Sequence, residues 1–363
     1  MRSTHSQKLE RWLGREGVEE ISRLWRGYHG PDPIPVANVP GRVYATNDGD
    51  FVGAIKGGYF ASLADYWSQK VNRVARRAVN RSVLHAGFSS VSDMVSEITT
   101  GGKLQVRPIA KAGVTGVSAV ANSLWDVGNQ PSAGGTSAAP AGSSPDNTTA
   151  GGLQQSNAAG GDSLYFMGAN IFGDTGNRTL LLYDRFFQVN HDMTVDPRTV
   201  TGVPTRYQST AAKGAFITHL VTTVLPAATP TYEITYVDQD GNAAEAAAVQ
   251  TIVSGSIARR FPYAATVGAG WYYPLNAGDI GVRSVTNLNL SAAMASGATD
   301  VVLGKPIATI PIVAAGVAVP VDATLSPWMM VNIVDNACLA LLEMTRNSTT
   351  ATNYGGLIYL GSG

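Results

Sequence analysis

Between residues 232 and 241 the chain reads Tyr232-Glu233-Ile234-Thr235-Tyr236-Val237-Asp238-Gln239-Asp240-Gly241. Apolar and polar side chains alternate in the first half of this stretch, which is the pattern of a strand with one buried face. The second half is rich in Asp and ends in Gly, which favours a tight hairpin connection. The stretch therefore predicts an antiparallel strand that turns back on itself.

Strand signals of the same kind continue through residues 163–363, where Val-, Ile-, Thr- and Tyr-rich runs alternate with turn residues. The expected strands are Leu180–Leu182, Phe216–Leu225, Tyr232–Val237, Ala247–Val253, Thr286–Leu290, Val301–Leu303, Ile307–Val313 and Met329–Val334. Many short strands at this spacing predict a mainly β body, a jelly-roll-like antiparallel β-sandwich. Residues 335–346 are expected to form a short capped helix that buries Cys338 as a small hydrophobic side chain.

Composition narrows the class of protein. The 363 residues include 26 Lys and Arg and 26 Asp and Glu, so that only 14% are charged, against about 25% in an average globular chain. Hydrophobic residues make up 44%, enough to bury a core, and the single cysteine excludes a disulfide framework. No apolar run predicts a transmembrane helix, and the polar N-terminus does not have the pattern of a secretory signal. A charge-poor, Gly-rich chain favours an assembly subunit over an enzyme.

Residues 1–58 are expected to form N-terminal helices followed by a Pro-rich extended arm. Apolar clusters predict one or two helices within 5–28, and the prolines of 30–41 exclude a helix and favour an extended path. The arm either clasps an adjacent subunit or connects parts of its own chain across the surface. The expected interface residues are Trp12, Trp25, Tyr28, Pro31, Pro33, Pro35, Trp67, Arg73, Arg77 and Arg81.

Residues 59–127 are expected to be a helical or mixed segment that opens with an amphipathic helix over 59–83. Its apolar stripe consists of Phe60, Leu63, Trp67, Val71, Val74 and Ala78, and its basic stripe of Lys70, Arg73, Arg77 and Arg81. The basic stripe could contact nucleic acid or an acidic partner. A solvated basic face is the favoured interpretation, because no aromatic residue interleaves the stripe.

Residues 128–162 are a Gly-, Ser- and Ala-rich stretch with two charged residues, Asp146 and Asp162, and no aromatic residue. This composition predicts a linker, which would need contacts from elsewhere to be ordered. Charge is also uneven along the chain: residues 1–111 have six more basic than acidic residues, and residues 112–363 have six fewer. The two halves could attract each other between copies, or the charges are simply scattered.

Catalytic and cofactor-binding motifs are missing from the sequence. It contains no nucleophile elbow, no P-loop and no dinucleotide-binding glycine pattern after a strand, and its five histidines do not stand at ligand spacing. We therefore expect no catalytic residue, no cofactor and no metal.

Two polar groupings deserve separate interpretations. The first, Asp238, Asp240, Asn242 and Glu245, could bind Ca²⁺ but does not match an EF-hand, so a hairpin turn is favoured. The second, Asp184, His191, Asp192 and Asp196, would suit acid–base chemistry if its members converged. A polar loop is the favoured alternative for this second grouping.

Three stretches between Phe216 and Ile312 carry a resemblance. They are 232–241, quoted above, then Tyr273-Pro274-Leu275-Asn276-Ala277-Gly278-Asp279-Ile280-Gly281-Val282-Arg283-Ser284-Val285, and Lys305-Pro306-Ile307-Ala308-Thr309-Ile310-Pro311-Ile312. In composition and residue order these stretches resemble tailed-bacteriophage virion proteins. The third stretch is expected to be an edge strand, because Pro311 cannot donate to a ladder.

The resemblance implies a structural virion protein of the head decoration (cement) type, located in the virion, and it carries over no catalytic residue. The expected partners are copies of the chain itself, with a trimer suggested by analogy, and other virion proteins, but no membrane. A tail, neck or baseplate component is an alternative. A glycan-binding β-sandwich is another, with Trp271, Tyr272 and Tyr273 stacking on a sugar ring.

Overall fold

The computed structural model describes residues 90–99, 101–113, 120–256, 258–262, 271–323, 330–345 and 350–363. The chain divides into two units, Met1–Arg77 and Ala78–Gly363, and every described residue belongs to the second. Its helices are α4 (Val91–Thr99) and the 3-10 turn η1 (Gln208–Thr210). Its strands are β1 (Leu104–Lys111), β2 (Ala121–Ser123), β3 (Asn129–Gln130), β4 (Leu164–Gly173), β5 (Arg178–Asp192), β6 (Arg198–Thr199), β7 (Phe216–Thr223), β8 (Thr231–Asp238), β9 (Glu245–Ala246), β10 (Gln250–Thr251), β11 (Val282–Leu290), β12 (Ala298–Ile312), β13 (Val321–Asp322), β14 (Asn332–Ile333), β15 (Leu339–Thr345) and β16 (Tyr354–Ser362).

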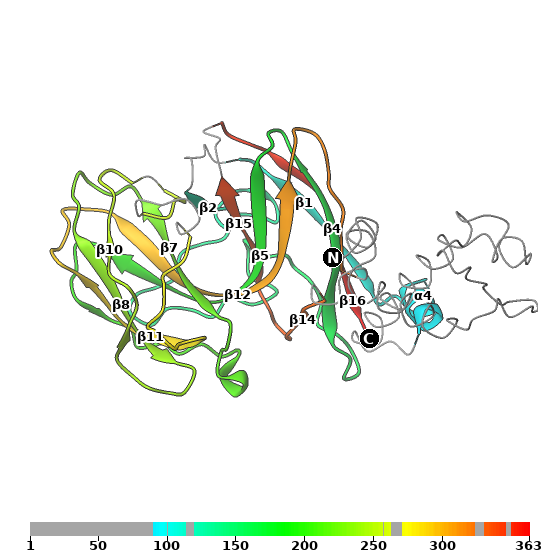
Figure 1. Cartoon of the computed structure of the whole chain (residues 1–363), viewed down its shortest axis with the longest axis horizontal. Coiled ribbons are helices and arrows are strands. Elements are labelled where there is room, and N and C mark those ends of the chain that lie inside the picture. The colour runs from blue at the N-terminus through cyan, green and yellow to red at the C-terminus, as the bar shows by residue number, and fades with distance from the viewer. Residues whose placement is uncertain are drawn as a thin grey trace, which may run out of the picture. The chain divides into compact units, whose positions relative to one another are not determined.

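The strands form three antiparallel sheets (Figure 1). The first has the order β13-β4-β16-β1-β3, with β14 beside β4; the second has the order β2-β15-β5-β12-β7; and the third has the order β10-β8-β11-β6, with β9 beside β8. The mainly β, antiparallel class predicted from the sequence is confirmed, and the packed sheets are consistent with a β-sandwich.

Two apolar cores lie against the second sheet. The first core joins side chains of β4 and β16, such as Phe166 and Ile358, to Leu180 of β5. The second core joins Phe187 of β5 to β7, β8 and β11, with Tyr236 as one of its buried aromatic side chains. The longest strands, β5 and β12, have 15 residues each and contribute to both cores. A strand of this length spans about 50 Å, which lets one sheet support two sandwiches.

The sheets begin earlier than the expected start of the body at residue 163. Strand β1 starts at Leu104 and pairs along its whole length with β16, the last strand of the chain. The sequence pattern did not predict strands β1, β4 and β16, and the same reason applies to all three. They contain Pro108, Gly168, Gly355 or other residues that are depleted in strands, so only pairing with neighbours reveals them.

The expected helix over 335–346 is wrong. The chain turns at Asn336, which has a φ of 59°, and continues as β15, paired with β5 on one side and β2 on the other. Leu339 and Leu341 belong to the first core, whereas Ala340 and Leu342 belong to the second. Because both faces of β15 are buried, its first four residues, Leu339–Leu342, are all apolar, and a short apolar run of this kind does not distinguish a strand from a helix.

One of two local predictions is confirmed. The 232–241 stretch forms β8 and its turn, and the chain returns as β9, with Tyr236 opposite Glu245. In β12, residues 298–304 pair with both β5 and β7, whereas residues 305–312 pair with β5 alone among the described strands. The expected edge strand is therefore part of an interior strand, since β12 lies between β5 and β7, although Pro311 falls in the stretch that pairs with β5 alone among the described strands.

Candidate functional site

The residues expected from the sequence to make the interface all lie in 1–89, outside the described residues, as does the amphipathic helix over 59–83. Their roles remain predictions. Three other features of the described chain bear on function: a polar pocket, a set of buried polar groups between the sheets, and an uncharged surface at the end of the second sandwich.

The low-complexity segment 128–162 begins with β3 in the first sheet, and its residues 143–153 then contact the second sheet. Ser143 and Gln188 exchange two backbone hydrogen bonds, of 2.8 and 2.9 Å, and the N–H of Leu153 donates to the carbonyl of Leu339 at 2.8 Å. These bonds supply the contacts that the composition of the segment lacks. The segment thereby forms one wall of a pocket over β5.

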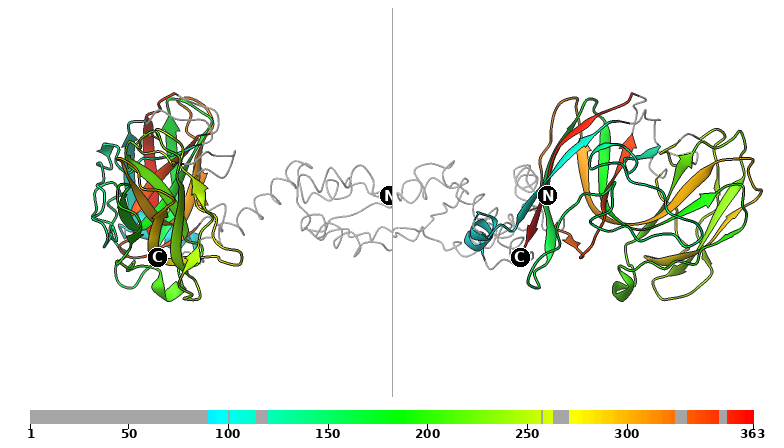
Figure 2. Two further views of the ribbon diagram at one scale, coloured as in Figure 1. Left: turned by 90° about the vertical axis from the view of Figure 1, so that its left-hand side faces the viewer. Right: turned by 180° about the vertical axis from the view of Figure 1, so that it is seen from behind.

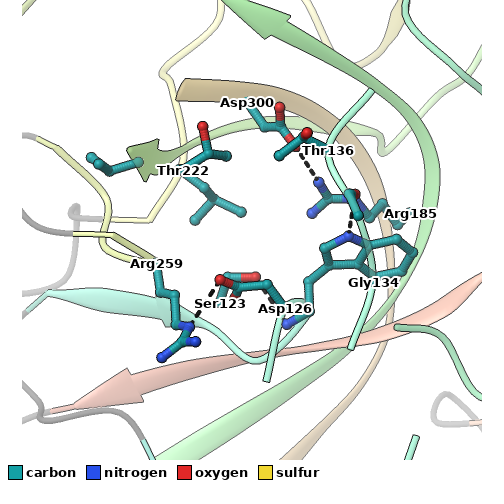
Figure 3. A pocket seen from close by; sticks show the side chains of 12 residues that line it. Ser123, Asp126, Gly134, Thr136, Arg185, Thr222, Arg259 and Asp300 are labelled. Atoms are coloured by element: carbon teal, nitrogen blue, oxygen red, sulfur yellow. Dashed lines mark hydrogen bonds and ion pairs between the residues drawn. The ribbon is translucent and has the colours of Figure 1, made fainter. Parts of the chain in front are cut away.

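The pocket is lined by side chains that come from distant parts of the sequence (Figure 3). Its polar lining consists of Ser123, Asp126, Thr136, Arg185, Thr222, Arg259 and Asp300. Gly134 lets the low-complexity segment approach closely, since a Cβ at this position would stand 2.2 Å from the Trp125 ring.

Arg185 is the central cation of the pocket and is buried. Its Nη2 forms an ion pair of 3.2 Å with Asp300, and its Nε donates to Gln188 Oε1 at 2.6 Å. The guanidinium carbon lies 4.5 Å from the centroid of the Trp125 ring, within cation–π distance. Its Nη1 makes no hydrogen bond to the described residues, and Figure 3 shows the guanidinium directed toward the pocket.

The size and charge of the pocket limit what it can hold. Its cavity volume is about 60 Å³, whereas ligand pockets usually measure about 300 Å³ or more. Two arginines face two aspartates, so the charges balance. Asp126 Oδ1, like Arg185 Nη1, is buried without a hydrogen-bond partner among the described residues. One donor and one acceptor in so small a space suit a few bridging waters.

A second buried ion pair lies at the junction of β5 and β15. Arg206 donates to Asp184 through Nε at 3.0 Å and Nη2 at 2.8 Å, and the N–H of Cys338 donates to the same carboxylate at 2.8 Å. Burial raises the pKa of the Asp184 carboxyl, and the Arg206 guanidinium opposes that rise. A third buried pair joins Arg178 to Glu343.

The second polar grouping does not converge on one site. The Asp184 carboxylate accepts hydrogen bonds from Arg206, whereas Asp192 accepts hydrogen bonds from Thr194 in its own turn. Asp196 accepts from the backbone N–H of Leu290, and His191 bonds the Tyr232 hydroxyl and the carbonyl of Val195. Each side chain has a separate structural partner, which removes the geometric basis for acid–base chemistry.

The first polar grouping organises the hairpin after β8. The Asp238 carboxylate accepts three hydrogen bonds of 2.8 Å, from the backbone N–H groups of Asp240 and Asn242 and from the Asn242 amide. Glu245 instead accepts from Asn276 at 2.7 Å. The loop is therefore a hairpin turn held by hydrogen bonds to the Asp238 carboxylate.

The three aromatic residues proposed for glycan stacking pack inward. Trp271 lies edge-on to Phe216 with ring centroids 5.0 Å apart, and Tyr272 leans on Trp271 at 4.8 Å. Tyr273 is fully buried and shares a hydrogen bond of 3.2 Å with His219. These rings do not form an exposed platform for a sugar.

Arg185, Asp300 and Trp125 could not be recognised from the sequence as members of one site. Asp300 lies 115 positions after Arg185, and no spacing rule links residues across such a distance. One local signal was available, because Asp184 and Arg185 interrupt the otherwise apolar run of β5. Charged residues inside such a run indicate buried ion pairs.

An uncharged surface lies at the end of the second sandwich. Segments 221–232 and 246–256 contain no charged residue, and backbone hydrogen bonds join them, from Leu225 to Ser256 and from Gly255 to Pro226. Val224, Val249 and Val253 are exposed there. We call these three residues the valine surface.

The comparisons with known proteins give little guidance. No protein-family model and no curated protein matches the chain. Among solved structures, the VP2 subviral particle of infectious bursal disease virus is 8% identical with a TM-score of 0.16, covering 71% of this chain and 80% of that one. A structure of the Gt strain of the same virus is 8% identical with a TM-score of 0.15, covering 74% and 86%. Both TM-scores are below 0.5, so this weak likeness to virus particles carries no argument about fold or role.

Two searches of the described residues were also negative. They contain no group of three or more His, Cys, Asp or Glu side chains placed to hold a metal ion. In the same part of the chain, every helix is too short or too polar to span a membrane.

Proposed function

We propose that this chain is a structural subunit of a virus particle, a phage capsid decoration (cement) protein or another shell protein. It would act in the virion, as a homo-oligomer such as a trimer, in contact with other virion proteins. Its β body would supply the packing surface, and its N-terminal helices and Pro-rich arm would reach neighbouring subunits.

The valine surface is the observation that carries this proposal. Exposed apolar side chains favour burial against another protein, because this removes apolar area from water. The buried charged side chains are Lys111, Arg178, Asp184, Arg185, Arg206, Asp238, Asp300 and Glu343.

Quantitative mass spectrometry of the purified particle that contains this chain tests the proposal. Hundreds of copies per particle are expected for a shell protein. A small number such as 3, 6 or 12 would indicate a tail, neck or baseplate component instead. Absence of the chain from particles, together with a positive glycan-array screen, would overturn the structural role in favour of glycan binding.

The arm is tested separately by deleting residues 1–58. The shortened chain is expected to fold but to lose its place on particles, with the aromatic residues Trp12, Trp25 and Tyr28 contributing most of the lost affinity. Wild-type occupancy by the shortened chain would refute the role of the arm.

A further inference from the structure

Two histidines, His191 on β5 and His219 on β7, lie on the same face of the second sheet. His191 pairs with Thr299 of β12. His219 pairs with Val301, two residues further along the same strand. Residues two apart on a strand point to the same face, and cross-strand partners share that face. Both histidines have 0% exposed surface, so their rings enter the second core together.

Tyr232, the second residue of β8, links the two histidines. Its hydroxyl lies 2.8 Å from His191 Nδ1, and its ring stacks on the His219 ring with centroids 4.3 Å apart. The other ring nitrogen of His191, Nε2, lies 2.8 Å from the carbonyl oxygen of Val195. A carbonyl only accepts, so Nε2 carries the proton of the neutral ring and Nδ1 accepts from the Tyr232 hydroxyl. His219 Nδ1 shares a hydrogen bond of 3.2 Å with the Tyr273 hydroxyl. We call His191, His219, Tyr232 and Tyr273 the histidine–tyrosine cluster.

A second proton on either ring conflicts with this packing. On His191 it would have to bind Nδ1, which would turn the acceptor of the tyrosine hydroxyl into a donor. Burial lowers the pKa of His191, and the Arg198 guanidinium adds to this shift. The carboxylates of Asp192 and Asp196 act in the opposite direction without cancelling it. Burial also holds the pKa of His219 well below its ordinary value, and His191 adds to that shift because two positive rings repel. Acid therefore favours a state in which both rings reach water.

The cluster lies next to the segments that carry the valine surface. Segment 221–232 begins two residues after His219 and ends at Tyr232. Segment 246–256 joins it through β10, where Gln250 pairs with Tyr232. Figures 1 and 2 show the third sheet, coloured green to gold, on the opposite side of the second sheet from β4 and β16. Displacement of Tyr232 would therefore disturb the valine surface and leave the first sandwich in place.

We propose that the histidine–tyrosine cluster is an acid-sensitive switch, which detaches the third sheet and the valine surface from the second sheet when His191 and His219 are protonated. Each histidine that gains a proton on opening increases the opening equilibrium up to about tenfold per pH unit below about 6.5. The first core should stay packed, because the described part of the chain has no other histidine. The consequence for assembly rests on the proposed function: the valine surface would meet neighbouring subunits at neutral pH, and acid would weaken that contact.

Amide hydrogen exchange of the full-length chain at pH 7 and pH 5 tests the switch, with each rate divided by the intrinsic rate at that pH. We expect β8 and segment 246–256 to lose protection about tenfold or more at pH 5. Protection in β4 and β16 should change by less than about twofold. Unchanged protection in β8 would overturn the proposal. Equal losses in β8 and β16 would indicate general acid unfolding and would overturn it as well.

The double variant His191→Gln/His219→Gln assigns the effect to the histidines. Glutamine can donate and accept hydrogen bonds at each position but gains no proton in this pH range. In this variant β8 should be equally protected at pH 7 and pH 5. The control Asp192→Asn removes an exposed carboxylate beside His191 and should keep the acid-dependent loss. A loss that persists in the double variant would refute the role of the histidines.

A measurement on the wild-type chain covers the case in which the double variant does not fold. NMR of the imidazole nitrogens reports which nitrogen carries the proton and at what pH each ring is protonated. His191 should be the Nε2–H tautomer at pH 7, and neither His191 nor His219 should gain a proton while β8 stays protected. Titration of both rings at about pH 6.5 with β8 still protected would overturn the switch. Both measurements use the isolated chain, so failure here is distinguishable from failure of the proposed virion role, which the copy number per particle tests.

Discussion

Replacing Arg206 with Met should be one of the most destabilising single changes on the second sheet. Asp184 is 0% exposed and accepts three hydrogen bonds, two of them from Arg206. Arg206→Met keeps much of the side-chain volume but leaves the carboxylate with only the Cys338 N–H. A buried charge without its partner is strongly unfavourable, because neither water nor an opposite charge compensates it.

The expected cost is about 3–5 kcal/mol in the free energy of unfolding, the range for breaking one partner of a buried pair. For a chain of this size each kcal/mol lowers Tm by about 2–3 °C, so a fall of about 6–15 °C is expected. The matched control is Arg259→Met, because the Arg259–Asp126 pair has a similar distance, 2.9 Å, but side chains that are 38% and 39% exposed. Its loss should cost no more than about 1 kcal/mol.

Urea denaturation and thermal melting of both variants measure these costs. The pH dependence adds a specific signature. Without Arg206 the pKa of Asp184 rises further above its unfolded value, so the folded state holds a proton that the unfolded state releases. The deficit of Arg206→Met should therefore shrink as pH falls from 7 toward 5, by up to about 1.4 kcal/mol per pH unit. Equal costs in the two variants, or a deficit that does not change with pH, would refute the reasoning.

Two further predictions concern buried titratable groups. Burial holds the pKa of His191 and His219 below the ordinary value, so the unfolded state binds more protons and stability should fall as pH drops below about 6.5. In His219→Gln the slope of the unfolding free energy against pH should decrease by about 1.4 kcal/mol per pH unit. An unchanged slope would contradict a lowered pKa of His219 in the folded state. Burial raises the pKa of the Cys338 thiol to about 12, so iodoacetamide at pH 8 should leave the native protein unlabelled and modify it fully in denaturant; rapid labelling of the native state would show that the junction of β5 and β15 opens.

The sequence pattern predicted the parts of the fold that depend on residues close to one another in the sequence. Alternation in Tyr232–Val237 predicted β8, and the Asp-rich stretch after it predicted the hairpin. Each of these follows from backbone chemistry within a few residues, such as side-chain alternation or turn geometry. The mainly β, antiparallel class was predictable on the same basis.

The candidate sites were not predictable in this way. The Arg185–Asp300 pair arises from the pairing of β5 with β12, whose residues are far apart in the chain. The same is true of β15, which became a strand because two cores cover its two faces. Local propensity is similar for a short apolar helix and a doubly buried strand, so long-range burial and pairing decide between them, and these exist only in the folded chain.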